Sequence, residues 1–370
     1  MDFSRDEADL ELAALARTIL ADHTSPARLT EVEAGGDRFD RPLWTELARA
    51  GVLAAALPES VGGSGLGVLA RCAVLVEVGR AVAPVPYLSS IATAAAAVAE
   101  FGTAAQRAAW AEPAARGALV LTAALAEEVG DDPSAPVTAA TRDGDGWRVH
   151  GTKVAVPAGP VADLFLVPAD TSGGTTVFLV TPDDPGVAVR RQEIVDGDAE
   201  AVVELDHVAL GDDRVLAGGT QVSDWLAARE TVGRCAHQLG VTETALRMTA
   251  EYASGRVQFD RPIATFQAVG QRLADCYVDV EAIRLTMWQA AWRISENLPA
   301  ATEIATAKFW AADGGHRIAH AAVHVHGGVG IDVDYPLHRY FVAAKRNEFG
   351  LGGATTQLRR IGAALATEPA

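Results

Sequence analysis

The sequence predicts an α+β protein that is mainly α, with an N-terminal helical domain, a middle antiparallel β domain and a C-terminal four-helix bundle. Apolar residues recur at three- and four-residue steps in the first and last thirds of the chain, whereas short β-branched runs fill the stretch between them. The 370 residues, 49% of them hydrophobic, suffice for three domains with sizeable cores. We expect domain boundaries at 1–117, 118–215 and 216–370.

The first two domains are delimited by their local patterns. Helical periodicity runs from Phe3 to about Ala115, and Gly- or Pro-rich stretches at 34–37 and 58–67 interrupt it. In the middle domain the turn DGDG at 143–146 lies between two β-branched runs and predicts a hairpin. Further strands are expected at 176–180 and 201–205.

Long helical stretches return after Gln221. They are expected at 223–254, 265–296, 301–325 and 337–366, each long enough for a bundle helix. Within the second, the spacing of four apolar side chains predicts a face that packs against a shared core: Leu285, Trp288, Trp292 and Ile294.

Composition excludes several classes of function. The formal net charge of −17 argues against nucleic acid as a partner, because no basic surplus exists to replace counterions. Three distant cysteines, Cys72, Cys235 and Cys276, indicate neither a disulfide framework nor a zinc knuckle. The acidic N-terminus lacks the features of a signal peptide, and the alanine-rich run at 91–99 is too short to span a bilayer. We therefore expect a soluble cytoplasmic protein without a membrane partner.

Three histidines invite a metal hypothesis. His316, His320 and His324 follow one another at four-residue steps and would form a stripe on one helix face. A helical zinc site needs further converging ligands, and no other pair with metal-ligand spacing occurs in the chain. The alternative is a packed helix whose histidines are hydrogen-bonded or at the surface. We expect no metal.

Two stretches give the chain a family resemblance. One reads YASGRVQFDRPIATFQ over 252–267, and the other reads HVHGGVG over 324–330, followed by DYPLHRY over 334–340. Together they resemble the acyl-CoA dehydrogenases, whose patterns are Y-x-x-x-R-x-x-F-G-x-P/L-I-x-x-x-Q and Q-x-x-G-G-x-G followed by E-Y-P-x-x-R. WTELARAG at 44–51, PESVGGSG at 58–65 and GTK at 151–153 are similar to the family's earlier segments, so the resemblance covers nearly the whole chain.

The resemblance implies a set of residues that contact FAD. At the matching positions the family's arginine, phenylalanine and glutamine reach the pyrophosphate and adenine end of an FAD held mainly by a neighbouring subunit; here these residues are Arg256, Phe259 and Gln267. His324 replaces a further glutamine, and Gly327 and Gly328 would let the backbone approach the cofactor. A glycine pair that ends a helix is the alternative reading.

The implied reaction is α,β-dehydrogenation of an acyl-CoA thioester, in which a carboxylate removes the α-proton and the β-hydrogen leaves as hydride to the flavin. The usual glutamate position holds Leu351, and Glu348 lies three residues earlier, nearly one helical turn away. The family's second base position corresponds to Glu230, which would lie on the helix that ends near Arg256. Alternatively, Glu230 is a solvated charge near the start of that helix.

The β domain also departs from the family pattern. A family W-I-T stretch beside the flavin ring is replaced around Ala155 and Pro157, and T-E-P-x-A-G-S-D is unrecognisable in LAEEVGDD at 125–132. Retained adenine-end residues and altered ring contacts resemble one subunit of the heteromeric α2β2 acyl-CoA dehydrogenases of actinobacterial sterol side-chain degradation.

That resemblance implies an acyl-CoA substrate, such as a steroid-CoA, a paralogous partner subunit and an electron-transfer acceptor. Three alternatives stay open: a self-sufficient homodimer or homotetramer using Glu230, a catalytically silent structural partner, and a helical metal-binding protein.

Overall fold

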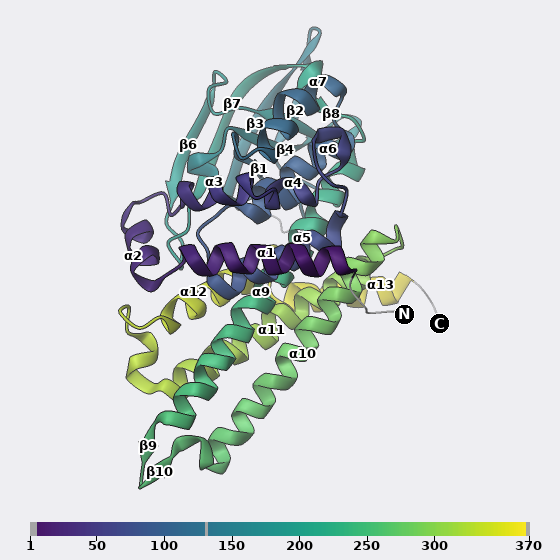
Figure 1. Cartoon of the computed structure of the whole chain (residues 1–370). Coiled ribbons are helices and arrows are strands. Elements are labelled where there is room, and N and C mark those ends of the chain that lie inside the picture. The colour runs from purple at the N-terminus through teal and green to yellow at the C-terminus, as the bar shows by residue number, and fades with distance from the viewer. Residues whose placement is uncertain (1–5, 130–131, 368–370) are drawn as a thin grey trace.

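The computed structural model describes residues 6–129 and 132–367. Figure 1 shows the β-sheet at the top, the N-terminal helices beside and beneath it, and the long C-terminal helices at the bottom. The predicted fold class is therefore confirmed. Of the predicted first helical stretch, Phe3 lies outside the described residues.

Short helices and one buried helix, α5, build the N-terminal part. Gly-rich segments separate the helices, as the sequence predicts, and Gly51, Gly62 and Gly65 adopt the positive φ angles that favour glycine. The elements are α1 (Glu7–His23), α2 (Pro26–Ala34), α3 (Arg41–Arg49), α4 (Val52–Ala55), η1 (Glu59–Val61), α5 (Gly67–Ala81), the π-helical η2 (Tyr87–Ala95), α6 (Ala96–Phe101), α7 (Ala104–Gln106), η3 (Arg107–Ala111) and α8 (Glu112–Ala115).

An eight-stranded sheet with the order β6-β7-β3-β2-β4-β5-β8, to which β1 adds beside β4, forms the middle part. Its strands are β1 (Leu121–Ala123), β2 (Ala139–Asp143), β3 (Gly146–Pro157), β4 (Leu164–Thr171), β5 (Gly174–Val180), β6 (Val187–Gln192), β7 (Glu200–Gly211) and β8 (Val215–Leu216), with short helices η4 (Gly159–Val161) and η5 (Asp212–Arg214). The predicted hairpin is confirmed, because Asp143 pairs with Gly146. The sheet is mixed rather than purely antiparallel, since β4 runs parallel to β1 and to β2.

The C-terminal part contains α9 (Thr220–Gly255), α10 (Gln267–Ser295), α11 (Ala301–His326), α12 (Leu337–Phe349) and α13 (Ala354–Thr367). Between α9 and α10 lies the hairpin β9 (Val257–Gln258) and β10 (Arg261–Pro262), followed by η6 (Ile263–Thr265), and η7 (Gly327–Ile331) follows α11. The first three predicted helices are confirmed. The fourth prediction was wrong as a single helix, because the glycine-containing segment 350–353 separates α12 from α13.

The prediction for the apolar face of α10 was partly wrong. Ile294 is buried, and Trp288 packs partly buried against the core, but Leu285 is 54% exposed. Leu285 shares a helix face with Trp288 and Trp292, three and seven residues further on, whereas Ile294 lies on the opposite face, so the four side chains cannot all face one core.

Close packing of α5 on α9 joins the N-terminal part to the bundle. A Cβ at Gly240 would lie 2.0 Å from the carbonyl oxygen of Val76, and one at Gly79 would lie 2.1 Å from that of His237. The two backbones can approach this closely only because both residues are glycines.

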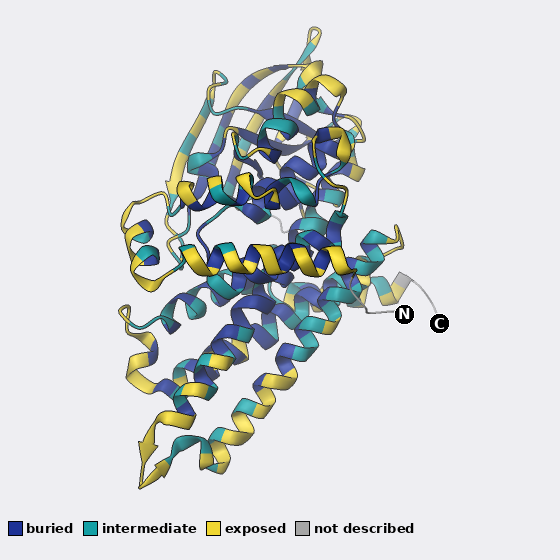
Figure 2. Ribbon diagram, viewed as in Figure 1, coloured by how far each residue is buried: buried dark blue, intermediate teal, exposed yellow. Residues whose placement is uncertain are grey.

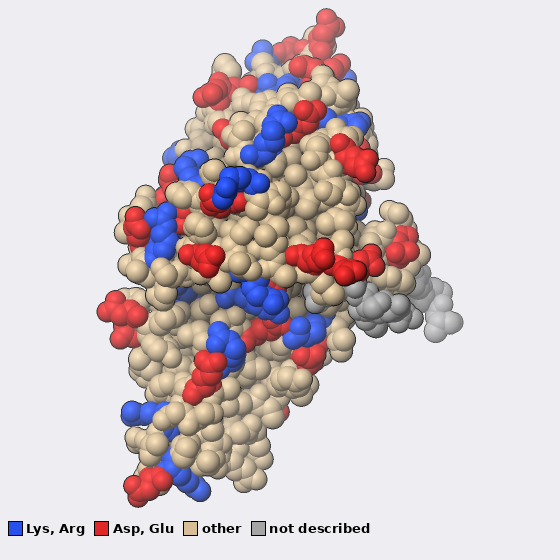
Figure 3. Space-filling model, in the orientation of Figure 1, with Lys and Arg blue, Asp and Glu red and all other residues tan. Residues whose placement is uncertain are grey.

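The surface carries mixed charge, and the end of the bundle away from the sheet is exposed to solvent. Figure 2 shows the β9–β10 tip as exposed, and Figure 3 shows acidic and basic groups interspersed over the visible face. Among the described helices, none is both long enough and apolar enough to cross a membrane.

Candidate functional site

A cavity of about 280 Å³ lies where the sheet, the segment between β6 and β7, and helices α9 and α12 of the bundle meet. It brings together the positions at which the sequence departs from the family pattern, although they are far apart in the chain. The lining residues are Ala123, Leu125, Ala126, Ala155, Pro157, Ile194, Val195, Glu200, Glu230, Arg234, Lys345, Arg346, Phe349, Gly350 and Leu351. Part of the segment 125–132 cannot be placed in it, because Gly130 and Asp131 lie outside the described residues.

Glu230 is buried in α9 and faces η2. Its Oε2 accepts a hydrogen bond of 2.8 Å from the hydroxyl of Thr93, and its Oε1 lies 3.1 Å from Nη2 of Arg234, one turn further along the helix. The second contact is an ion pair without hydrogen-bond geometry, because Oε1 has no hydrogen-bond partner. With only 4% of the residue exposed, the alternative of a solvated charge near a helix N-terminus was wrong.

A cluster of charges centred on Arg346 of α12 occupies the cavity wall beside Pro157. Its Nε donates to Oε1 of Glu200 at 2.9 Å, and its guanidinium also pairs with Asp198 and, at 3.8 Å, with Asp196. Burial acts to lower the pKa of Arg346, but the carboxylates, Asp198 first, outweigh burial and raise it. Arg346 therefore stays charged and ties α12 to the segment between β6 and β7.

The carboxylates respond unequally to that guanidinium. Burial raises the pKa of Asp196 and of Glu200 above the usual range despite the nearby Arg346. Burial also acts to raise the pKa of Asp198, but Arg346 outweighs it and the pKa is lowered. Asp198 is thus the principal counter-ion of Arg346.

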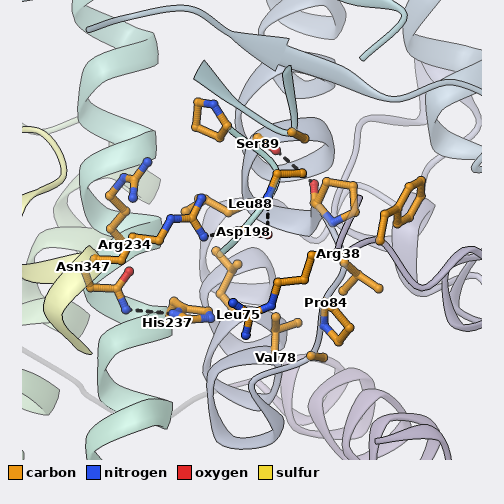
Figure 4. Close-up of a pocket in the computed structure, with 18 of the residues that line it drawn as sticks. Arg38, Leu75, Val78, Pro84, Leu88, Ser89, Asp198, Arg234, His237 and Asn347 are labelled. Atoms are coloured by element: carbon orange, nitrogen blue, oxygen red, sulfur yellow. Dashed lines mark hydrogen bonds and ion pairs between the residues drawn. The ribbon is translucent and has the colours of Figure 1, made fainter. Parts of the chain in front are cut away.

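A second, smaller cavity of about 80 Å³ continues behind this cluster and is drawn in Figure 4. His237 of α9 lies there, and its Nδ1 accepts a hydrogen bond of 2.8 Å from the side-chain amide of Asn347. Burial, followed by the charge of Arg346, lowers the pKa of His237 to about 3. His237 is therefore neutral, so a general base at this place would be a weak one.

Leu351, at the position of the usual glutamate, lies in the break between α12 and α13. Its backbone adopts φ 60°, and it packs partly buried against the main core. A Cβ on the preceding Gly350 would lie 2.7 Å from Nη1 of Arg234, so the glycine makes room for that guanidinium. Glu348 points elsewhere: its carboxylate contacts Lys345 at 2.6 Å and His316 at 3.1 Å. It does not replace the missing group.

The flavin-ring positions of the sheet offer few free hydrogen-bonding groups. The backbone N–H of Ala155 already donates to Oε1 of Gln192 at 2.7 Å, and the carbonyl of Ala126 accepts from the N–H of Val154 at 3.0 Å. Pro157 has no N–H to donate. An isoalloxazine ring has nitrogen and oxygen atoms that need such partners, so the groups that this chain presents here do not fit it.

The residues predicted at the adenine end of FAD lie far from this cavity, at the tip of the bundle. Arg256 is the C-cap residue of α9, Phe259 lies in the β9–β10 turn with 87% exposure, and exposed Gln267 begins α10. No carboxylate pairs with Arg256 among the described residues. Phe259 adopts φ 54° and stacks edge-to-face on Phe266.

The end of α11 lies beside the end of α9. His326 stacks on Tyr252 of α9 with ring centroids 4.3 Å apart, and the Tyr252 hydroxyl donates to the His326 carbonyl. This contact brings exposed His324, Gly327 and Gly328 to the same end of the bundle as Arg256. Gly327 has φ 67° and ends α11, as the alternative reading required, and its exposed backbone also faces outward.

The histidine stripe does not form a ligand set. His316 and His320 pack with ring centroids 4.3 Å apart, and His320 also contacts Phe341. His316 pairs with Glu348 instead of meeting a third histidine.

Sequence reasoning missed Arg234 and Arg346. Arg234 had a readable signal, because it follows Glu230 by four residues on a predicted helix, the spacing of an intrahelical ion pair. Arg346 had none, since its acidic partners lie about 150 residues earlier in the chain and only the fold brings them together.

Comparison with known proteins identifies the chain. Models of the acyl-CoA dehydrogenase N-terminal, middle and C-terminal domains match residues 6–118, 122–207 and 217–366. The chain belongs to the acyl-CoA dehydrogenase family, whose members are flavin-dependent oxidoreductases acting on CH–CH bonds.

Three relatives are especially similar to it. Acyl-CoA dehydrogenase FadE27 of Mycobacterium tuberculosis is 50% identical over 378 residues, 100% of both chains. A chain of the ChsE4-ChsE5 complex from Mycobacterium tuberculosis superposes with a TM-score of 0.97 at 51% identity, again covering 100% of both. A chain of the Tcur3481-Tcur3483 steroid ACAD G363A variant gives a TM-score of 0.93 at 43% identity and covers 98% of both.

Proposed function

We propose that this chain is one subunit of a heteromeric, FAD-dependent acyl-CoA dehydrogenase. It would complete the adenine end of an FAD site whose flavin-ring contacts and catalytic base come from a paralogous partner. The likeness to a ChsE4-ChsE5 chain, from a complex of two different subunits, supports the heteromer. The likeness to a steroid acyl-CoA dehydrogenase chain supports a steroid side-chain CoA thioester as the substrate.

The separation of the two halves of the site carries this proposal. Arg256, Phe259 and Gln267 are exposed at one end of the molecule. A guanidinium there suits phosphate oxygens because its planar fork makes charge-assisted hydrogen bonds. The interior cavity, by contrast, has an apolar wall where ring contacts are expected and Leu351 where the base is expected. The predicted adenine end keeps the family's arginine, phenylalanine and first glutamine, whereas the positions for the ring contacts and the base are altered.

A self-sufficient homomeric enzyme that uses Glu230 is the second candidate. It is favoured by one observation, that Glu230 is buried and lines the larger cavity. Arg234 and Thr93 weigh against it, because each of the two carboxylate oxygens of Glu230 already contacts one of these side chains. A catalytically silent structural partner would share the altered cavity but would have no use for an exposed Arg256.

Flavin stoichiometry tests the proposal. The chain would be purified alone and together with its paralogous partner, and flavin would be counted per chain from the absorbance spectrum. We expect little flavin in the chain alone and one FAD per pair of different subunits in the complex. A flavin-loaded homomer that an acyl-CoA reduces would refute the heteromer. Re-oxidation of the reduced complex by candidate acceptors would then identify the electron-transfer acceptor.

Arg256→Ala in this chain separates a cofactor role from a structural one. We expect the complex to assemble but to lose most of its FAD, because the pyrophosphate loses a charge-assisted partner. Arg247→Ala is the matched control, since Arg247 is also an exposed arginine of α9 and forms an ion pair with Glu251 on the helix surface. Unchanged FAD content in the Arg256 variant would favour the silent structural partner.

A further inference from the structure

Another group of side chains with ligand chemistry lies outside the cavities, on the sheet. His150 of β3 and Asp206 and His207 of β7 are exposed, and one ligand atom from each lies within 4.8 Å of the other two. Across the residues that the structure describes, no other set of three His, Cys, Asp or Glu side chains is grouped in this way. Neither the predicted FAD contacts nor the proposed substrate site uses them.

An irregularity in the pairing of β3 with β7 creates this group. Val149 pairs with Val208, but the next pair is Gly151 with Leu205, so the single residue His150 faces both Asp206 and His207. In a regular strand two successive side chains would point to opposite faces of the sheet. The β-bulge instead brings both beside His150.

The backbone at the bulge is strained, and the strained residue is a histidine. His207 adopts φ 51°, a left-handed conformation in which a glycine would be less strained. Its ring stacks on that of His150, with centroids 4.6 Å apart and planes inclined by 16°. The nearby guanidinium of Arg148 does not compete for the ring atoms, because it donates to the carbonyl of His207 and to the carboxylate of Asp143.

We propose that His150, Asp206 and His207 bind a divalent transition-metal ion of the zinc class, with water as the fourth ligand. Two imidazole nitrogens and one carboxylate oxygen are a ligand set that Zn²⁺ takes in proteins. Bonds of about 2.0–2.1 Å place the ligand atoms of a tetrahedral site roughly 3.3 Å apart. Exposed side chains reach that spacing by rotation about χ1 and χ2, because χ2 of histidine is a soft torsion.

The bound ion would act as a clamp between β3 and β7. Beyond the bulge, β3 continues through Lys153 to Ala155 and Pro157, which line the larger cavity. A second irregularity, between Lys153 and Val156, separates that wall from the bulge, so the clamp would fix the pairing of β3 with β7 as far as Lys153. This inference does not depend on the proposed function, since metal binding is measured without flavin or substrate.

Titration of Zn²⁺ into the metal-free, tag-free full-length chain tests the site. We expect one Zn²⁺ per chain, an affinity at least about tenfold weaker in His150→Ala, and a spectrum typical of tetrahedral coordination when Co²⁺ replaces Zn²⁺. His207→Gly guards against misfolding, because glycine suits the backbone of that position. Its thermal midpoint without metal should equal or exceed that of the unmodified chain, while the rise on adding Zn²⁺ should be lost.

His320→Ala is the control, because His316 and His320 on α11 are the other neighbouring histidine pair. It should leave Zn²⁺ affinity unchanged. The proposal is overturned if binding follows His320 rather than His150, if His207→Gly keeps the Zn²⁺-dependent rise, or if the unmodified chain shows no saturable binding.

Discussion

Glu230 forms a buried ion pair with an arginine, so it is not a free carboxylate in the cavity. Its two carboxylate oxygens face Arg234 and Thr93, and the side chains of the ion pair are 8% and 5% exposed. Removing one member of a buried pair leaves the other charge without compensation, which typically destabilises a protein by several kcal/mol. The residue therefore has a structural task whether or not it has a catalytic one.

Glu230→Gln separates these tasks. In the complex with the partner subunit we expect kcat to be unchanged and the free energy of unfolding to fall by about 3 kcal/mol, because Arg234 loses its counter-ion. Thr93→Val, which removes only the hydrogen bond to Glu230, should cost about 1 kcal/mol. Activity assays and denaturant unfolding measure the two effects. A loss of about 10²-fold or more in kcat would instead make Glu230 the base.

Lys308 is a fully buried lysine on α11 whose Nζ donates to the carbonyls of Asn347 at 2.8 Å and Glu348 at 3.0 Å. These carbonyls belong to the last turn of α12, where the helix has no partners of its own for them. Burial lowers the pKa of Lys308 to about 8. Lys308 thus satisfies the last carbonyls of α12, and the free energy of keeping its charge buried depends on pH.

The sign of that dependence is fixed by the lowered pKa. Between about pH 8 and pH 10.5 the unfolded chain binds more protons at Lys308 than the folded chain, so this group makes the fold more stable as pH rises. We expect the unfolding free energy of the unmodified chain, relative to Lys308→Met, to increase by up to about 3 kcal/mol across that window. Denaturant unfolding at several pH values measures it. A constant difference would show that the pKa of Lys308 is not lowered.

At the scale of elements, the contact of α5 with α9 leaves no room for a side chain at Gly240. Gly240→Ala would place a methyl group 2.0 Å from a backbone oxygen of α5, which no side-chain rotation relieves. We expect a loss of about 3 kcal/mol in the free energy of unfolding, because the two helices must separate. Gly255→Ala on the same helix meets nothing within 4 Å and should change stability by no more than about 1 kcal/mol. Equal effects of the two substitutions would refute this packing argument.

Local sequence patterns predicted the elements well where each carries its own signal. The turn at 143–146 and the long helices ending near 255, 295 and 326 were readable from spacing and glycine placement. The break at 350–353 was missed because the helical pattern resumes on both sides of it. The parallel pairing of β1 with β4 was missed because contacts between distant segments leave no local pattern.

The candidate site also has a part that local sequence predicts and a part that only the fold creates. The residues predicted at the adenine end lie within two short motifs at adjoining helix ends, so a motif resemblance could propose them together. The charged cavity wall depends on Arg346 meeting Asp198 and Glu200, which are separated from it by 148 and 146 positions. No spacing rule covers a contact over that distance.

At the scale of the whole molecule, α10 presents apolar side chains to solvent. Tyr277, Val278 and Leu285 are 60%, 63% and 54% exposed, and Val278 and Leu285 lie seven residues apart, on one helix face. On the proposed function, an α2β2 assembly would cover that face, because apolar groups at an interface gain from leaving water.

Leu285→Asp tests whether this face is buried on assembly. We expect the complex to dissociate at concentrations at which the unmodified complex is intact, because burying an unpaired carboxylate is costly. Light scattering coupled to size-exclusion chromatography measures the mass. Leu15→Asp on α1 is the control, since Leu15 is 41% exposed on a different helix. If both variants assemble normally, α10 is not part of the interface.

The exposed tip formed by β9, β10 and the ends of α9 and α11 would make the proposed cofactor site one that two chains share. When a cofactor site is shared between two chains, its occupancy depends on the product of their concentrations as well as on that of the cofactor. On the proposed function, diluting the complex would release flavin without any change within either subunit. The flavin absorbance would then report the fraction of each chain that is assembled in the complex.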